Sequence, residues 1–401
     1  MAASGGTDVR SVEDRIARLA AESAVAFELS LPERPMRTVG RGEPAFRLHV
    51  HDRAGVEALA ALDELRLGEA YLDGHIDIEG DLRAVMDLRP LLTDRRLFTN
   101  LWTTMGPSVV LGRVRRDTRA IKQHYESDPE FYLSFLDSVV HGYSNGHYEY
   151  EDEALEKAII RKLDHAIEAC EVGPGSSVLD VGVGWGAFTT HAGRRGIRVT
   201  GLTISSESRR FVSDLVERDQ LPCTVLEQHL FEHRPRVPYD AIVVLGVTEH
   251  LPDYRATLKE YERLLRPGGR VFLDASAAPR KYSTSSFARA HVWPGGGSFM
   301  HLSSYVRAVE QSRFDVLSVQ NDRRNYEITT RQWAENLERN REQIVRRWGE
   351  RPYRLFRLYL WGSSHALATG ALDAYRLLLA LPEHARPQRR RWRSNQHAER
   401  R

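Results

Sequence analysis

The sequence predicts an α/β protein, in which a mostly parallel sheet covered by helices follows a smaller α+β amino-terminal domain. From residue 151 onward, short apolar segments alternate with amphipathic segments, which is the pattern of βαβ units. The chain has 401 residues, enough for about two or three domains. It is 41% hydrophobic and 28% charged, as is typical of folded globular proteins. We therefore expect two folded domains.

Changes in composition divide the chain into five parts. They are a disordered start, the amino-terminal domain, a connector and cap, the sheet domain and a basic tail, at residues 1–11, 12–110, 111–150, 151–382 and 383–401. The connector begins within an apolar stretch, Leu97–Val114, that contains Gly106 and Pro107. This stretch is either a buried connector or the lining of a substrate entrance.

The amino-terminal domain is expected to contain both helices and strands. Residues 11–29 carry apolar side chains at helical spacing, and residues 45–52 alternate like a strand. Residues 54–80 are predicted to be helical until a turn at Asp73 and Gly74. The recognisable pattern ends near residue 92.

The sheet domain opens with a helix at residues 152–170 and continues with strands joined by helices. Five strands are expected, at residues 176–182, 197–204, 223–228, 239–247 and 269–276. Helices between them are expected at residues 188–195, 205–219 and 253–265. An irregular insert, a helix, a strand, two helical stretches and a last strand follow, with the insert at 278–298 and the strands at 314–322 and 374–381.

Charge and cysteine content limit the ligands that we expect the protein to bind. A net charge of +2 is too small to imply binding to nucleic acid. Arginine clusters at residues 112–122 and 386–401 are either solvated segments or surfaces that dock onto anionic lipid. Cys170 and Cys223 have no metal-site spacing and are expected to be buried thiols. Without a signal peptide or a long apolar run, we expect a cytoplasmic protein with at most peripheral membrane contact, and a homo-oligomer stays open.

The loop "LDVGVGWGAF" (179–188) follows the first strand and opens a helix, so it lies where open α/β sheets bind ligands. A dinucleotide loop would read G-x-G-x-x-G, with an acid about 20 residues further on. Here Gly182, Gly184 and Gly186 alternate around the bulky Trp185, and the second strand ends in "GLTIS" without a carboxylate. Glycines let the backbone approach a ligand closely. This spacing favours S-adenosylmethionine over a pyrophosphate.

Several segments together resemble the cyclopropane-fatty-acyl-phospholipid synthase family, which includes mycolic acid modifying methyltransferases. In chain order they are "LRLGEAYLDGHIDIEGDL", "HYESDPEFYLSFLDSVVHGYSNGHY", "VLDVGVGWGAF", "VTGLTIS", "TEHL", "LLRPGG" and "NYEITTRQW". The resemblance implies a Rossmann-like class I methyltransferase sheet, S-adenosylmethionine as cofactor and a lipid-associated amino-terminal domain. It also implies the cofactor contacts, which are Tyr143, Ser144, Gly182, Gly184, Gly186, Thr203, Ile204, Gln228 and His229.

The same resemblance implies the chemistry. In the family, an alkene of an acyl chain attacks the methyl group, and the resulting carbocation loses a proton to a bicarbonate held by a Glu, a Tyr, a His and a Cys. Glu249 and Tyr326 stand at the first two positions, but Asp274 and Gly142 replace the His and the Cys. A second family cysteine aligns with Ser363. Bicarbonate is therefore not expected to bind as it does in the family.

Asp274 offers another proton acceptor. Two carboxylates about 4 Å apart repel by roughly 4 kcal/mol at an effective dielectric of about 20, and this repulsion pushes their pKa values apart. His141 and His250 are further candidates for a base. Structural roles also stay open: Glu249 as a helix cap, Tyr326 as a core aromatic and Asp274 as a strand-end acid.

Three functions follow from these residues. The first is a C-methyltransferase that acts on an unsaturated acyl lipid, for which we expect an apolar pocket. The second is a methyltransferase that acts on an alkene-bearing or other small secondary metabolite, with a shorter and more polar pocket. The third is a binder without catalysis. The insert is expected to form a lid, with Gly295, Gly296 and Gly297 as hinges.

Overall fold

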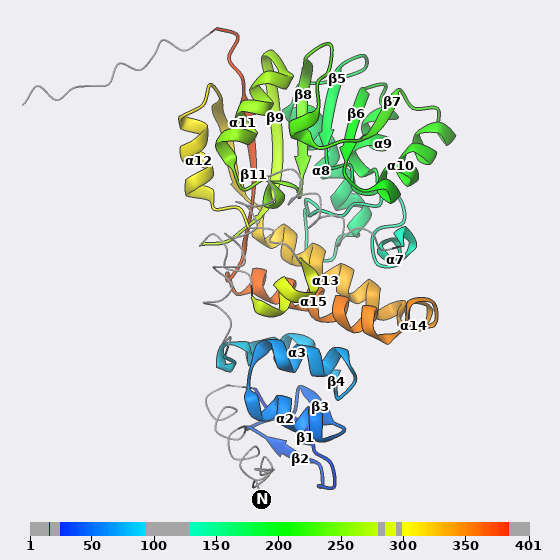
Figure 1. Cartoon of the computed structure of the whole chain (residues 1–401), viewed down its shortest axis with the longest axis vertical. Helices are drawn as coiled ribbons and strands as arrows, with labels where there is room; N and C mark the ends of the chain where they lie inside the picture. Colours follow the sequence, from blue (N-terminus) through cyan, green and yellow to red (C-terminus); the bar gives the residue numbers. More distant parts are fainter. Residues whose placement is uncertain (1–15, 17–24, 94–127, 280–284, 294–298, 385–401) are drawn as a thin grey trace, which may run out of the picture.

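The computed structural model describes residue 16 and residues 25–93, 128–279, 285–293 and 299–384. Figure 1 shows a large sheet at one end of the molecule, a small sheet at the other end and a layer of helices between them. Several sequence predictions lie outside the described residues: the disordered start, the whole apolar connector stretch, both arginine clusters and the three hinge glycines. Among the described residues, no helix combines the length and apolar character needed to cross a bilayer.

The large sheet has seven strands in the order β10-β11-β9-β8-β5-β6-β7. β5 to β9 pair in parallel, and β11 runs antiparallel to both β9 and β10. The strands are β5 Ser177–Val181, β6 Arg198–Thr203, β7 Cys223–Glu227, β8 Tyr239–Leu245, β9 Leu265–Ala277, β10 Asp315–Asn321 and β11 Asp373–Ala380. The predicted α/β class is confirmed, and each strand lies where the sequence predicts one.

Helices cover both faces of this sheet. Val178 of β5 enters a core cluster with α8, whereas Leu179 and Val181 enter a second cluster with α11 and α12. These helices are α8 Leu155–Ala169, α9 Ala187–Gly193, α10 Ser206–Arg218, α11 Tyr254–Leu264 and α12 Leu302–Glu310. Burial on both faces explains the continuous apolar runs of the strands. Cys170 is buried at the end of α8, but Cys223 is only half-buried in β7, so the expectation for Cys223 was wrong.

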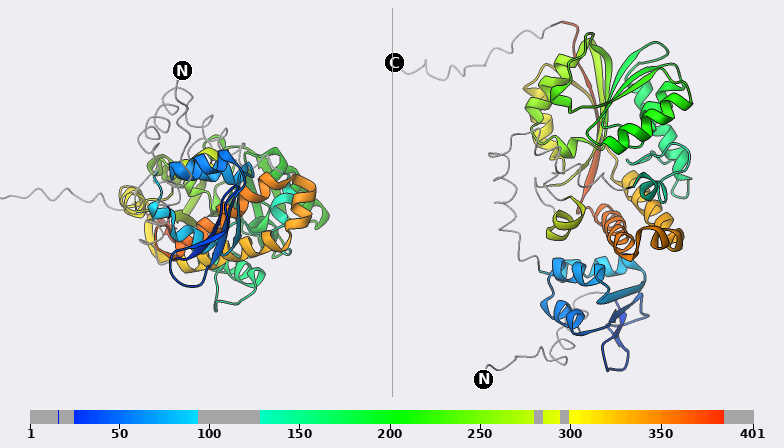
Figure 2. Two further views of the ribbon diagram at one scale, coloured as in Figure 1. Left: turned by 90° about the horizontal axis from the view of Figure 1, so that it is seen from below. Right: turned by 45° about the vertical axis from the view of Figure 1, so that its right-hand side comes forward.

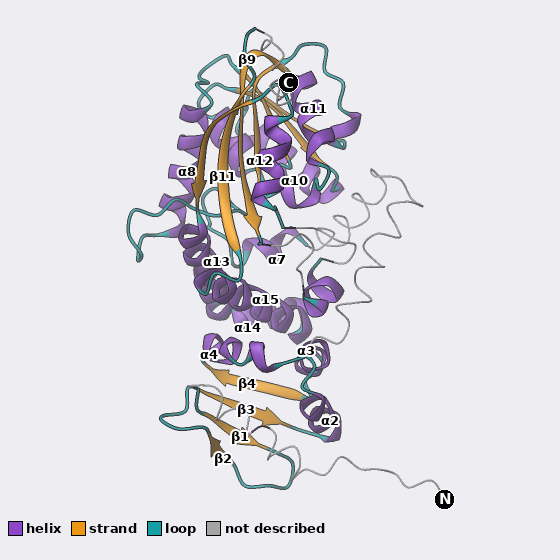
Figure 3. Ribbon diagram, turned by 90° about the vertical axis from the view of Figure 1, so that its left-hand side faces the viewer, coloured by secondary structure: helices purple, strands orange, loops and turns teal. Residues whose placement is uncertain are grey.

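A layer of three helices lies beneath the sheet (Figure 3): α13 Arg323–Arg339, α14 Arg341–Trp348 and α15 Glu350–Ala368. The prediction of two helical stretches here was wrong. Asn340 separates α13 from α14, and Gly349 separates α14 from α15. Gly349 has a φ of +88°, a conformation that glycine adopts without steric cost, so the chain turns there.

The small amino-terminal sheet has the order β2-β1-β3-β4. Its elements are β1 Phe27–Ser30, β2 Arg37–Val39, β3 Phe46–Val50, α2 Arg53–Ala61, α3 Glu64–Leu72, β4 Ile76–Gly80, α4 Leu82–Asp87 and η1 Arg89–Leu91. A short helix α7, Pro129–Leu133, precedes the sheet domain, and the insert contains a π-helical turn η4, Ala288–Val292. The mixed α+β character predicted for this region is therefore observed.

Two helix predictions in this unit need correction. Residues 27–29 belong to strand β1, because Phe27 and Leu29 alternate into the core and the ring of Phe27 stacks on Phe46 of β3 at 4.8 Å. The single helix expected after residue 54 is broken at Leu62, which has a φ of +49°. Asp63 then caps α3, its side chain accepting from the Arg66 amide at 3.1 Å.

Arginines of α15 connect the amino-terminal unit to the domain that contains the large sheet. Arg354 donates to the Tyr71 carbonyl at 2.9 Å and pairs with Asp77 at 2.6 Å. Arg357 donates to the Ile78 carbonyl at 3.0 Å. The right-hand view of Figure 2 shows α13 and α15 between the large sheet and the amino-terminal unit. The amino-terminal unit is therefore attached through buried polar contacts as well as apolar packing.

Replacing Arg354 with Met is expected to lower the free energy of unfolding by about 1–3 kcal/mol, because it removes charged hydrogen bonds to the Tyr71 carbonyl and to Asp77. Arg351 is the matched control, since it pairs with Asp73 but is 53% exposed. Arg351→Met should change stability by less than about 1 kcal/mol. Urea denaturation measures both values, and equal losses would contradict this assignment.

Candidate functional site

A cavity of about 120 Å³ lies at the carboxyl edge of β5, β6 and β8. Eight of the nine residues predicted to contact a cofactor line it: Tyr143, Ser144, Gly182, Gly184, Thr203, Ile204, Gln228 and His229. The ninth, Gly186, is not among the lining residues. It caps α9 with a φ of +90°, and a Cβ there would lie 3.1 Å from Val212. A side chain at position 186 would therefore strain the backbone and crowd Val212 of α10.

The glycine loop is shaped by two different constraints. Gly182 has a φ of +85°, and a Cβ on it would lie 2.4 Å from Val247. Gly184 has a φ of +52°, but a Cβ there would meet nothing within 4 Å. Gly182 is thus needed for packing, whereas Gly184 borders open space in the cavity. We call this space the glycine-loop cavity.

Three titratable groups of this cavity, His141, Asp180 and His250, were not assigned to it from the sequence. Asp180, the next-to-last residue of β5, accepts from the Thr189 hydroxyl at 2.7 Å and has a pKa that burial raises to about 6. His250, predicted only as a spare base, has a pKa that burial lowers to about 4. The aspartate stands in "VLDVG", immediately before the glycines, and that position was the available signal. His250 is neutral near pH 7.

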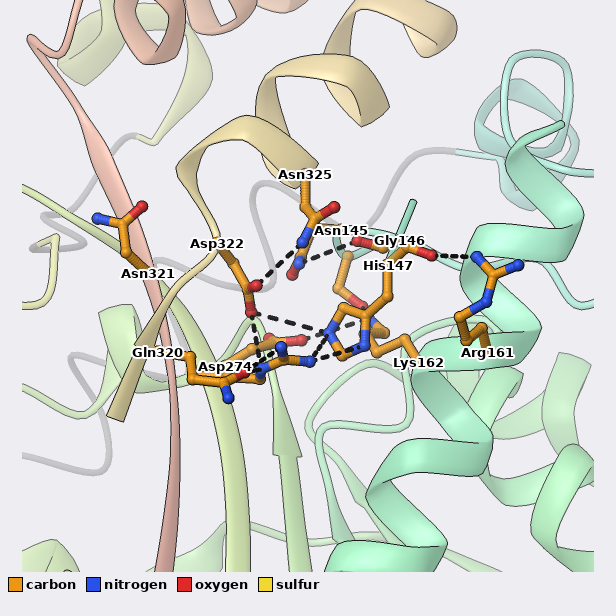
Figure 4. Close-up of polar contacts among 12 residues, drawn as sticks. Asn145, Gly146, His147, Arg161, Lys162, Asp274, Gln320, Asn321, Asp322 and Asn325 are labelled. Atoms are coloured by element: carbon orange, nitrogen blue, oxygen red, sulfur yellow. Dashed lines mark hydrogen bonds and ion pairs between the residues drawn. The ribbon is translucent and has the colours of Figure 1, made fainter. Parts of the chain in front are cut away.

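A fully buried lysine, also not predicted, connects three parts of the site (Figure 4). Lys162 of α8 donates to the Ser144 hydroxyl and pairs with Asp274 of β9 at 3.3 Å. The other oxygen of Asp274 accepts from the Gly246 amide at 2.7 Å. Burial lowers the pKa of Lys162, and Asp274 opposes that shift. Asp274 therefore faces a cation and is held in place by two donors.

A second polar cluster lies beside this pair (Figure 4). The guanidinium of Arg376 lies 2.8 Å from the ring of His147 and 3.5 Å from Asp322. Burial and Arg376 lower the pKa of His147 to about 2, so the ring is neutral. Asp322 also accepts from Asn325 at 3.0 Å, at the start of the helix that carries Tyr326. The cluster thus fixes the beginning of α13.

Glu249 lies in an apolar setting among tyrosines. One oxygen of Glu249 accepts from the Ser276 amide at 2.6 Å, and the other is buried without a hydrogen-bond partner among the described residues. Burial, reinforced by Asp274, raises the pKa of Glu249 to about 7. Burial also raises the pKa of Tyr326 well above its usual value, and Glu249 adds to that shift. Glu249 and Tyr326, predicted as catalytic residues, are therefore neighbours.

Tyr359 of α15 joins this group. Its hydroxyl lies close enough to Tyr143 of the glycine-loop cavity for Tyr143 to lower its pKa, although burial, the larger effect, raises that pKa to about 12. Tyr359 also lines a second cavity of about 570 Å³, which is predominantly apolar. We call this second space the apolar cavity. The Tyr143–Tyr359 contact thus connects the lining of one cavity with the lining of the other, next to Glu249.

Comparisons with known proteins place this arrangement in a family. The model of mycolic acid cyclopropane synthetase matches residues 113–377, and a model described as a domain of unknown function matches residues 18–90. The chain belongs to the mycolic acid cyclopropane synthetase family. The predicted resemblance is thereby confirmed.

Proteins similar to this chain include one of known crystal structure and two that are known by their sequences. The structure of mycolic acid cyclopropane synthase CmaA1 complexed with SAH and CTAB has a TM-score of 0.61 and 26% identity, covering 66% of this chain and 98% of that one. "Sphingolipid C9-methyltransferase" of Candida albicans is 25% identical over 331 residues, which is 77% of this chain and 64% of that protein. "Probable fatty acid methyltransferase" of Pseudomonas putida is 27% identical over 329 residues, 79% of this chain and 82% of that protein.

The family and its structural relatives make this chain an S-adenosylmethionine-dependent methyltransferase. The residues of the glycine-loop cavity fit that cofactor, because eight of the predicted contacts and the carboxylate of Asp180 border one space beside the open Gly184. The residues present do not fit the family's bicarbonate set. Gly142 has no room for a cysteine, since a Cβ there would lie 2.8 Å from Ile159, and Asp274 is occupied by Lys162.

Gly184→Ala is expected to weaken binding of S-adenosylhomocysteine by about tenfold or more, because the new methyl group enters the glycine-loop cavity. Gly175 is a matched control: it also has a left-handed φ, of +86°, and open space at its Cβ position, but it does not line either cavity. Gly175→Ala should cost similar stability and leave affinity unchanged. Calorimetric titration with S-adenosylhomocysteine measures both affinities, and equal affinities for the two variants would contradict the assignment of Gly184 to the cofactor site.

Lys162→Met is expected to lower the free energy of unfolding by about 3–5 kcal/mol, since it leaves the buried Asp274 without a cation. Adding Asp274→Asn to that variant removes the unpaired charge and should recover most of the loss. Urea denaturation at neutral pH measures the three proteins. A single variant as stable as the wild type would show that the pair contributes nothing.

Proposed function

We propose that this enzyme transfers the methyl group of S-adenosylmethionine to an alkene carbon within a long acyl chain of a lipid. The observation that carries the proposal is the contact between the two cavities at Tyr143 and Tyr359, beside Glu249. A cofactor site next to a large apolar space suits an electrophilic methyl group and a hydrocarbon acceptor. Relatives named as fatty acid and sphingolipid methyltransferases support the same substrate class.

The cofactor, when bound, supplies a methyl group activated by a positively charged sulfur. In the proposed reaction, the two π electrons of the alkene form the new C–C bond and the electron pair of the broken C–S bond stays on sulfur. The substrate is left as a carbocation. The rings of Tyr143 and Tyr326 both contact Trp333, and Tyr359 lies near Tyr143 and Glu249, so a cation formed at this junction would be close to aromatic rings, whose faces stabilise a cation in a dry site.

We assign the proton acceptor to Glu249. Its second oxygen has no partner among the described residues, and its pKa of about 7 lets it accept a proton near neutrality. Asp274, the acceptor proposed from the sequence, has both oxygens engaged, one by Lys162 and the other by the Gly246 amide. Loss of a proton from the transferred carbon would give a cyclopropane, and loss from a neighbouring carbon would give a methyl-branched alkene.

The alternative of a small polar substrate draws support only from the replacement of the family's His and Cys by Asp274 and Gly142. It predicts a shorter and more polar pocket, whereas the lining of the apolar cavity is mostly hydrocarbon. Incubation with methyl-labelled cofactor separates the two functions. Label in unsaturated phospholipid supports the acyl substrate, and label found only in polar extracts would overturn it.

Glu249→Gln is expected to lower turnover by about 10²–10⁴-fold while S-adenosylhomocysteine still binds, because the base is lost and the cavity is kept. In the wild type, turnover should fall tenfold for each pH unit below about 7 and stay level above it, since only ionised Glu249 accepts a proton. The double variant Lys162→Met with Asp274→Asn should keep this rise. If Glu249→Gln kept the rise as well, another group would be the base.

A further inference from the structure

We propose that the amino-terminal four-stranded unit forms the distal half of the acyl-chain site and thereby selects the length of the chain. This inference rests on the proposed function. It concerns residues 25–93, which make up a separate sheet with its own core and contain none of the residues predicted to take part in catalysis. The apolar cavity lies between this unit and helix α15.

One face of α15 forms the first wall of the cavity. Its lining residues recur at helical spacing and are Leu358, Tyr359, Gly362, Ser363 and Ala366. From Tyr359 to Ala366 this face extends about 10 Å along the helix axis, at roughly 1.5 Å per residue. Tyr359 lies at the reacting end, next to Glu249 and Tyr143. The cavity therefore leads away from the chemistry, along α15.

The amino-terminal unit forms the opposite wall. Its sheet contributes alternate residues of its strands, and its helices contribute apolar side chains: Phe27, Phe46, Leu48, Ile76 and Ile78 from strands, and Leu59, Leu67, Val85 and Met86 from helices. On β3, Leu48 lines the cavity, whereas the neighbouring Arg47 is half-exposed and pairs with Glu28. The sheet thus presents a hydrocarbon face to α15.

The insert closes the side of this space. Phe287, just before η4, packs so tightly on α3 that a Cβ on Gly68 would lie 2.3 Å from its ring. Trp293 lines the cavity as well and its ring contacts Tyr359 with centroids 5.4 Å apart. Three parts of the chain that are distant in sequence therefore enclose one apolar volume.

The side chains that line the apolar cavity favour a hydrocarbon ligand over a polar one. No lining residue among those described has a buried polar side-chain atom that lacks a partner, and the charged pair Glu64–Arg89 is satisfied internally at 3.2 Å. A volume of about 570 Å³ is within the range of roughly 300–1,000 Å³ that ligand sites occupy. Because a lipid headgroup is polar, the segment that fits here is the methyl-terminal part of the acyl chain, beyond the double bond.

The experiment uses the full-length enzyme with myristoleoyl, palmitoleoyl and oleoyl phosphatidylglycerol. These lipids share the position of the double bond counted from the carboxyl end and differ in the length of the methyl-terminal segment. Leu48→Trp, which fills the distal cavity, should lower kcat/KM for the oleoyl lipid relative to the myristoleoyl lipid by about tenfold or more. Arg47→Trp, on the other face of the same strand, should leave this ratio within about twofold of the wild type.

An unchanged ratio in a Leu48→Trp protein that still binds S-adenosylhomocysteine would overturn the inference. Should Leu48→Trp not fold, Gly362→Leu fills the same space from α15, where the nearest atom to a new Cβ is the Met86 sulfur at 3.8 Å. That variant should shift the ratio in the same direction.

Binding of cis-parinaric acid, a fluorescent fatty acid, separates this inference from the proposed function. If the wild type methylates none of the lipids but binds the probe, and Leu48→Trp abolishes that binding, the acyl site stands and the proposed reaction falls. If the wild type methylates the lipids and Leu48→Trp leaves both the chain-length ratio and the probe affinity unchanged, the reaction stands and the role of the amino-terminal unit falls. Absence of both turnover and probe binding overturns both.

Discussion

The site depends on a single buried cation. Lys162 reaches from α8 to Ser144 beside the cofactor cavity and to Asp274 at the end of β9, so one ammonium group joins a helix, a loop and a strand. A charge removed from water is tolerated only when it is paired and hydrogen-bonded, which ties the position of each of these elements to the others. Asp274 is paired in this way, whereas Glu249, which has one oxygen without a partner among the described residues, has a pKa that burial raises to about 7.

The structure accommodates the two departures from the family pattern, at Asp274 and Gly142. The exchange of a histidine for Asp274 adds a negative charge, and Lys162 supplies the compensating positive charge on a different element. The exchange of a cysteine for Gly142 matches the close approach of Ile159. Glu249 and Tyr326, which match the family pattern, lie next to Tyr359.

Helix α15 gives the molecule its second organising feature. It packs against α13 beneath the large sheet, and its arginines bind carbonyl groups and acids of the amino-terminal unit. The same helix presents Tyr359 and small residues such as Gly362 to the apolar cavity. One helix therefore both attaches the amino-terminal unit and encloses the apolar cavity. In the proposed acyl-chain site, this is how the amino-terminal unit contacts the substrate although it lies far from the glycine loop.

Local sequence pattern was enough to predict the alternation of strands and helices, the loop of Gly182 and Gly184, and the family. These are legible because hydrophobic periodicity and glycine spacing act over a few residues. The burial of Lys162 could not be predicted in this way, because in the sequence it is one more polar residue of an amphipathic helix and its partner Asp274 is 112 positions away. The break at Leu62, the strand at Phe27 and the apolar cavity likewise arise from packing between distant segments, because burial is a property of the assembled fold and not of any one segment.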